Sequence, residues 1–175
     1  MHSELGSADP HIWLSPRLVK QQAQNVLNAL VEADPAHKEQ YRSNMAEFSA
    51  ELDSLDARIR SALAPYRGRT VFVFHPAFGY FMAEYALVQQ AVERGGRSPT
   101  PKELSRLIAK ARAENAAAIF VQPQFDTRSA EVVADAIGGA VVAIDPLARD
   151  LLKNFEVMAE AVAGALGGGR EGADR

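Results

Sequence analysis

The stretch Val71-Phe72-Val73-Phe74-His75-Pro76 decides the fold class, because an unbroken apolar run ends there at a polar side chain. Continuous rather than alternating hydrophobicity is typical of a strand covered on both faces, as in a parallel sheet. Further short apolar runs follow along the chain, at residues 87–91 (the weakest), 118–121 and 141–144. The sequence therefore predicts a four-stranded sheet.

Helical signals lie between these runs. Helices are expected to begin near Pro76, near Thr100-Pro101 with Glu103 in the first turn, near Ser129, and after Pro146. Because strand and helix alternate, the chain is predicted to form an α/β domain with a mostly parallel sheet flanked by helices.

The part of the chain before the sheet is predicted to be helical. Ser15-Pro16 offers an N-cap followed by proline at the first helical position, which indicates a helix over about 16–33. The same signal returns at Asp34-Pro35, and apolar residues then recur every three or four positions to Leu63. This second helix, over about 35–64, is much longer than the mean of about 11 residues. It could run along the outside of a domain or connect two domains.

Composition excludes several classes of function. The 175 residues are 47% hydrophobic and 23% charged, which suits one globular domain. A net charge of -3 without long runs of either sign argues against binding to nucleic acid or to an anionic membrane. No stretch approaches the roughly 20 apolar residues of a membrane span. Because the chain has no cysteine, a transition-metal site would have to use His, Asp or Glu.

Polar residues that directly follow the predicted strands are the candidates for a site, since ligands of open α/β sheets bind at the carboxyl ends of the strands. His75 and Asp145 hold such positions and could converge on one point. Taken singly, His75 could instead be a hydrogen-bonded core histidine, and Asp145 a helix cap. His11 precedes the first helix, and it could be a loop histidine whose neighbour Trp13 is the core residue.

No catalytic residue is predicted. The nucleophile-elbow string G-x-S-x-G does not occur, and no glycine-rich phosphate loop follows a predicted strand, because Gly95-Gly96 and Gly138-Gly139 match neither pattern. A zinc hydrolase would need a base beside the metal, and no H-E-x-x-H string supplies one. His2 and His37 are expected to have no role.

Motifs in order along the chain resemble those of the zinc and manganese solute-binding proteins of ABC importers. They are Asp9-Pro10-His11-Ile12-Trp13-Leu14-Ser15-Pro16, Phe74-His75-Pro76-Ala77-Phe78-Gly79-Tyr80-Phe81, Val121-Gln122-Pro123-Gln124-Phe125 and Ile144-Asp145-Pro146-Leu147. Such receptors are periplasmic, have two α/β lobes joined by a long helix, hold metal in the cleft between the lobes, and deliver it to a permease. The resemblance implies that this chain is the zinc-binding C-terminal lobe with its linker helix.

The resemblance also implies the metal ligands, which are His11, His75 and Asp145. Zinc receptors typically carry histidine at the position of His75, where manganese receptors carry glutamate. Imidazole suits zinc and harder oxygen ligands suit manganese, so zinc is favoured over manganese as the bound metal.

We expect the chain to divide into a lead with the first ligand motif (1–15), a helical hinge segment with the long linker helix (16–66) and the α/β lobe (67–166). The tail (167–175) is expected to be disordered, because it is rich in glycine and charged residues. The first residues lack a signal peptide, and we expect the chain to be a truncated receptor without its N-terminal lobe. A fourth zinc position would then be filled by water, by a second copy of the chain, or by the missing lobe in trans. An interaction module that has lost the metal stays open as an alternative, as does a zinc hydrolase.

Overall fold

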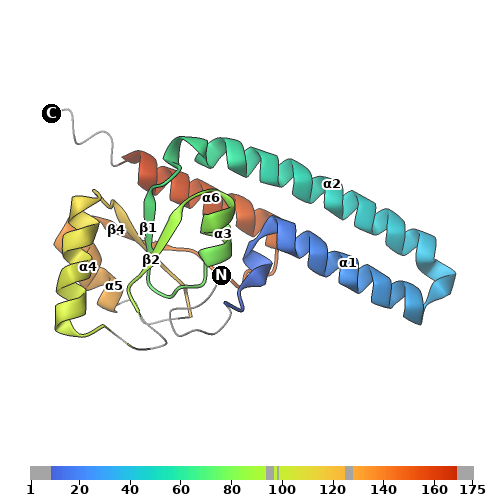
Figure 1. Cartoon of the computed structure of the whole chain (residues 1–175), viewed down its shortest axis with the longest axis horizontal. Helices are drawn as coiled ribbons and strands as arrows, with labels where there is room; N and C mark the ends of the chain where they lie inside the picture. The colour runs from blue at the N-terminus through green and yellow to red at the C-terminus, as the bar shows by residue number, and fades with distance from the viewer. Residues whose placement is uncertain (1–8, 94–96, 98, 125–127, 169–175) are drawn as a thin grey trace.

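The computed structural model describes residues 9–93, 97, 99–124 and 128–168, in which a single parallel sheet is flanked by helices (Figure 1). The strand order is β2-β1-β3-β4. The strands are β1 (Thr70–Val73), β2 (Val88–Ala91), β3 (Ala118–Val121) and β4 (Ala140–Ala143). All three pairings are parallel, which confirms the predicted α/β class.

The α-helices are α1 (Pro16–Ala33), α2 (Lys38–Leu63), α3 (Gly79–Glu84), α4 (Pro101–Ala113), α5 (Arg128–Ile137) and α6 (Leu151–Gly168). Short 3-10 turns precede α1 (η1, Ile12–Leu14), precede α2 (η2, Pro35–His37) and follow α2 (η3, Ala64–Tyr66). The predicted helix starts are confirmed at α1, where Ser15 Oγ accepts a hydrogen bond from Leu18 N (3.2 Å), and at α4, where Thr100 and Glu103 form a capping box.

The two inner strands carry the core. Side chains of β1 alternate between two apolar clusters: Val71 and Val73 pack with α2, α3 and α6 on one face, while Phe72 packs with α4 and α5 on the other. The predicted burial on both faces is confirmed for β1 and β3. It is wrong for the edge strands, where Val88 of β2 is 48% exposed and Val141 of β4 is 36% exposed. An edge strand has a neighbour on one side only, so helices on the two faces cover it less completely.

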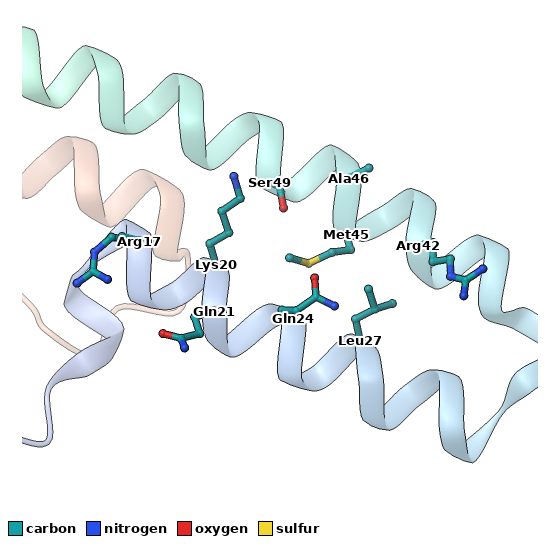
Figure 2. A pocket seen from close by; sticks show the side chains of 9 residues that line it. All are labelled: Arg17, Lys20, Gln21, Gln24, Leu27, Arg42, Met45, Ala46 and Ser49. Carbon is teal, nitrogen blue, oxygen red and sulfur yellow. The ribbon is translucent and has the colours of Figure 1, made fainter.

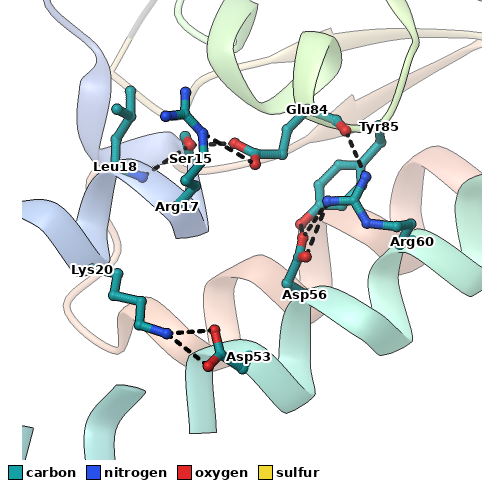
Figure 3. A network of polar contacts seen from close by, with 9 residues as sticks. All are labelled: Ser15, Arg17, Leu18, Lys20, Asp53, Asp56, Arg60, Glu84 and Tyr85. Atoms are coloured by element: carbon teal, nitrogen blue, oxygen red, sulfur yellow. Dashed lines mark hydrogen bonds and ion pairs between the residues drawn. The ribbon is translucent and has the colours of Figure 1, made fainter. Parts of the chain in front are cut away.

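Helices α1 and α2 form an antiparallel hairpin that projects from the α/β layer, and α2 packs along α6 (Figure 1). A polar network fastens the base of this hairpin to α3 (Figure 3). Ser15 Oγ donates to Glu84 at the end of α3, and Tyr85 Oη donates to Asp56 of α2 at 3.0 Å. The start of α1 is therefore held against the sheet domain, although most of α1 lies outside it.

One expectation concerns the end of the chain, and another concerns membrane spans. Gly167 and Gly168, expected to belong to a disordered tail, form the end of α6. The rest of the expected tail, residues 169–175, and residues 1–8 lie outside the described residues. Among the helices that the structure describes, none has the length and apolar character required to cross a bilayer.

Candidate metal site

His75 is held by its backbone at the carboxyl edge of the sheet. It follows β1 after Phe74, and the side chain of Gln122, which follows β3, makes two hydrogen bonds with it. Gln122 Nε2 donates to His75 O (2.9 Å), and His75 N donates to Gln122 Oε1 (3.3 Å). Gln122 is fully buried, so this amide clamp fixes where the histidine leaves the strand. The helix expected near Pro76 begins only at Gly79, because residues 75–78 form a turn with Ala77 N donating to His75 O.

The imidazole of His75 is paired with a carboxylate that sequence reasoning missed. His75 Nδ1 lies 2.6 Å from Glu93 Oε1, and Glu93 is 5% exposed. The sequence signal for it is that Glu93 is a charged residue two positions beyond the predicted strand at residues 87–91, and so lies at the same sheet edge as His75. With Nδ1 engaged by Glu93, Nε2 is the nitrogen through which His75 would coordinate a metal.

His11 has the same kind of support. Asp9 Oδ1 lies 2.7 Å from His11 Nδ1 and also accepts a hydrogen bond from His11 N (3.0 Å). Trp13, whose ring centroid is 5.4 Å from that of His11, donates from Nε1 to Pro146 O (2.8 Å). The segment before α1 is thereby tied to the loop after β4.

The structure brings His11 and His75 together. Their ring centroids are 5.6 Å apart, and the planes meet at 79°. Both side chains are only partly exposed, at 18% and 25%. Each ring thus lies at the protein surface with a carboxylate on Nδ1, an arrangement in which Nε2 can face a metal.

Asp145 lies after β4 but does not join the two histidines. Its Oδ1 accepts hydrogen bonds from Gln124 Nε2 (2.7 Å) and from Leu147 N (2.9 Å). Within the described residues, no group of three or more His, Asp or Glu side chains is close enough to hold a metal ion. The assignment of Asp145 as a ligand stays a prediction.

The alternative role considered for Asp145, capping the last helix, is filled by another residue. Asp150 Oδ1 accepts from Lys153 N (3.0 Å) at the start of α6. Asp145 instead closes a tight turn onto Leu147 N, and its carbonyl accepts from Asn154 Nδ2 (2.8 Å). This polar turn holds Asp145 near the sheet edge.

The remaining histidines lie elsewhere. His37 is at the turn between α1 and α2, with 68% of its side chain exposed and its Nδ1 2.6 Å from Asp34 Oδ2. His2 lies outside the described residues.

A hollow of about 590 Å³ between α1 and α2 is lined by neither candidate histidine (Figure 2). Its lining residues are Arg17, Lys20, Gln21, Gln24, Leu27, Arg42, Met45, Ala46 and Ser49. The three cations among them each have a carboxylate nearby, in the pairs Arg17–Glu84, Lys20–Asp53 and Arg42–Glu39. The positive charges that line the hollow are therefore partly balanced by neighbouring carboxylates.

The chain thus combines an α/β lobe, a long helical hairpin and two adjacent histidines at the carboxyl edge of the sheet. The family model described as "ZnuA: Zinc-uptake complex component A periplasmic" matches residues 1–166. The chain belongs to this zinc-uptake family of solute-binding proteins.

Individual relatives agree with the family assignment. A putative metal-binding protein of Chlamydia trachomatis is 34% identical over 158 residues, which are 90% of this chain and 57% of the relative. A crystal structure of ZnuA superposes with a TM-score of 0.92 at 42% identity, over 95% of this chain and 65% of that one. A ZnuA deletion mutant with zinc bound gives a TM-score of 0.89 at 42% identity, over 94% and 64% of the two chains. The chain thus spans less than two thirds of these relatives.

Proposed function

We propose that this chain binds zinc at the carboxyl edge of its sheet, as part of a receptor for zinc uptake by an ABC importer. The observation that carries the proposal is the juxtaposition of His11 and His75, each with a carboxylate on Nδ1. Carboxylate-supported imidazoles are the usual arrangement of histidine ligands of zinc. Manganese prefers harder oxygen ligands, so two imidazoles favour zinc.

Asp145 is proposed as the third ligand. Its loop is linked to the His11 segment by the hydrogen bond from Trp13 to Pro146, so the carboxylate and the histidines belong to one connected edge. To reach a metal beside the histidines, the Asp145 side chain would exchange its contact with Gln124 for the metal. A fourth position of the zinc tetrahedron would be taken by water or by a residue of another chain.

The proposed role is that of a receptor, with no reaction catalysed. By family, the location is the periplasm and the partner is an importer permease. The hairpin of α1 and α2 exposes Val26 (58%) and Leu30 (41%). We propose that a second copy of this chain covers them.

Zinc titration by calorimetry of metal-stripped protein tests the proposed site. The wild-type chain is expected to bind one zinc ion, and His11→Ala and His75→Ala are expected to weaken or abolish that binding. His37→Ala is the matched control, because it removes an exposed histidine with its own carboxylate partner and should leave binding unchanged. Absence of stoichiometric binding by folded wild-type protein would contradict the proposal.

A further inference from the structure

We infer that Glu93 is a positioning residue for zinc binding, which acts by holding the His75 ring so that Nε2 faces the metal. The inference rests on the proposed zinc site and adds a residue outside the predicted ligand set. Glu93 stands out because a carboxyl group is costly to bury without a polar partner, and this residue is 5% exposed. Its side-chain contact is the 2.6 Å pair with His75 Nδ1.

The backbone around Glu93 is locked to the backbone that leads into His75. Beyond the end of β2, Val92 N donates to Val73 O (2.8 Å) and Glu93 N donates to Phe74 O (3.0 Å). These bonds continue the pairing of β2 with β1 up to the residue before His75. The carboxylate therefore reaches His75 from a backbone that cannot shift independently of it.

His75 is consequently held from both sides of its strand. Glu93, beyond β2, contacts the ring, whereas Gln122, beyond β3, clamps the backbone. Gln122 hydrogen-bonds the backbone of His75, whereas Glu93 contacts its ring. Glu93 therefore adds a constraint on the orientation of the ring.

The chemistry gives Glu93 more than a packing role. A carboxylate accepting from Nδ1–H keeps the proton on that nitrogen, so the lone pair available to a metal lies on Nε2. The negative charge also makes the imidazole a stronger donor to a cation. Loss of such a partner typically lowers metal affinity about 10- to 100-fold.

The decisive variant is Glu93→Met, which keeps the length of the side chain and removes the acceptor. Zinc affinity is measured by competition with a chelating dye, and folding is checked by circular dichroism. We expect Glu93→Met to bind zinc about 10- to 100-fold more weakly than the wild type, and Glu93→Gln, which retains an acceptor oxygen, to lose less. In a His75→Ala background, Glu93→Met should change the residual affinity by less than about 2-fold, because residues that act through one another are not additive.

A second measurement needs no metal. In the ¹⁵N NMR spectrum of metal-free protein with neutral imidazoles, His75 is expected to carry its proton on Nδ1, and Glu93→Met to shift it toward Nε2. Unchanged zinc affinity in folded Glu93→Met, an equal loss in the His75→Ala background, or a wild-type proton on Nε2 would overturn the inference. Failure of wild-type protein to bind zinc would instead defeat the proposed function, while the NMR result still reports whether Glu93 sets the ring.

Discussion

His11 and His75 lie with their ring centroids 5.6 Å apart, although one precedes the first long helix and the other follows the first strand. The hairpin of α1 and α2 separates them in sequence and returns the chain to its starting point. The polar contacts of Ser15 with Glu84 and of Tyr85 with Asp56 fasten the base of that hairpin. The proximity of the two imidazoles is therefore a product of how the helices dock.

Replacement of the predicted carboxylate ligand should weaken zinc binding without unfolding the protein. Asp145→Asn keeps an oxygen that can accept from Leu147 N and removes the charge. We expect at least a roughly 10-fold loss of zinc affinity, measured by dye competition. Asp150→Asn, at the start of α6, is the control and should retain affinity. Equal affinities of Asp145→Asn and wild type would remove Asp145 from the ligand set.

Zinc should stabilise the folded chain by mass action. At a free zinc concentration of about 100 times the dissociation constant, the gain is about 2.7 kcal/mol, or several degrees in melting temperature. The gain should disappear on adding a chelator and should be much smaller in His75→Ala at the same zinc concentration. A thermal melt followed by circular dichroism checks this, and an equal shift in His75→Ala would point to zinc bound elsewhere.

The indole of Trp13 is predicted to couple the His11 segment to the Asp145 loop. Trp13→Phe removes the donor to the carbonyl of Pro146, a buried residue, at a cost of about 1–3 kcal/mol in unfolding free energy. Zinc affinity should fall as well, because the two loops are no longer tied. Urea unfolding in the presence of a chelator measures the loss of unfolding free energy. Tyr41→Phe, which removes a hydrogen bond to Asp34 at the exposed hairpin turn, should cost much less.

Alkaline pH should destabilise the fold through Tyr85. Burial, with the nearby Asp56 carboxylate, raises the pKa of Tyr85 above its ordinary value of 10.0. Because the folded-state pKa is raised, this contribution to stability is fully present below about pH 10 and is lost as pH rises above that value. Between about pH 9 and pH 11, the unfolding free energy of Tyr85→Phe should therefore fall less steeply with pH than that of the wild type. If the unfolding free energies of the two proteins fell equally with pH, the prediction would be wrong.

The exposed apolar residues of the hairpin predict self-association. Val26 and Leu30 lie on α1, away from the core, and uncovered apolar surface commonly becomes an interface. Light scattering at micromolar concentration should give a mass above the 18.9 kDa of one chain. Val26→Lys with Leu30→Glu should restore the monomer. A monomeric wild-type chain would contradict the prediction.

Local patterns in the sequence were enough for the α/β class and for most elements. Continuous apolar runs predicted the strands, and Ser15-Pro16 and Thr100-Pro101 predicted the starts of α1 and α4, because capping and strand burial depend on neighbours in the chain. The exposure of β2 and β4 was missed, since apolar runs alone do not say which strand lies at an edge. Strand ends also directed attention to His75 and Asp145.

The sequence by itself determined the layered fold, the position of His75 at a strand end and, through its motifs, the family. Only the tertiary structure decided that His11 meets His75, that Glu93 and Asp9 hold their rings, and that Asp145 turns toward Gln124 and Leu147. The physical reason is the distance along the chain over which each effect acts. Apolar periodicity and caps act over a few residues, whereas the site depends on strand order and on the docking of a helical hairpin, which bring together side chains far apart in the chain.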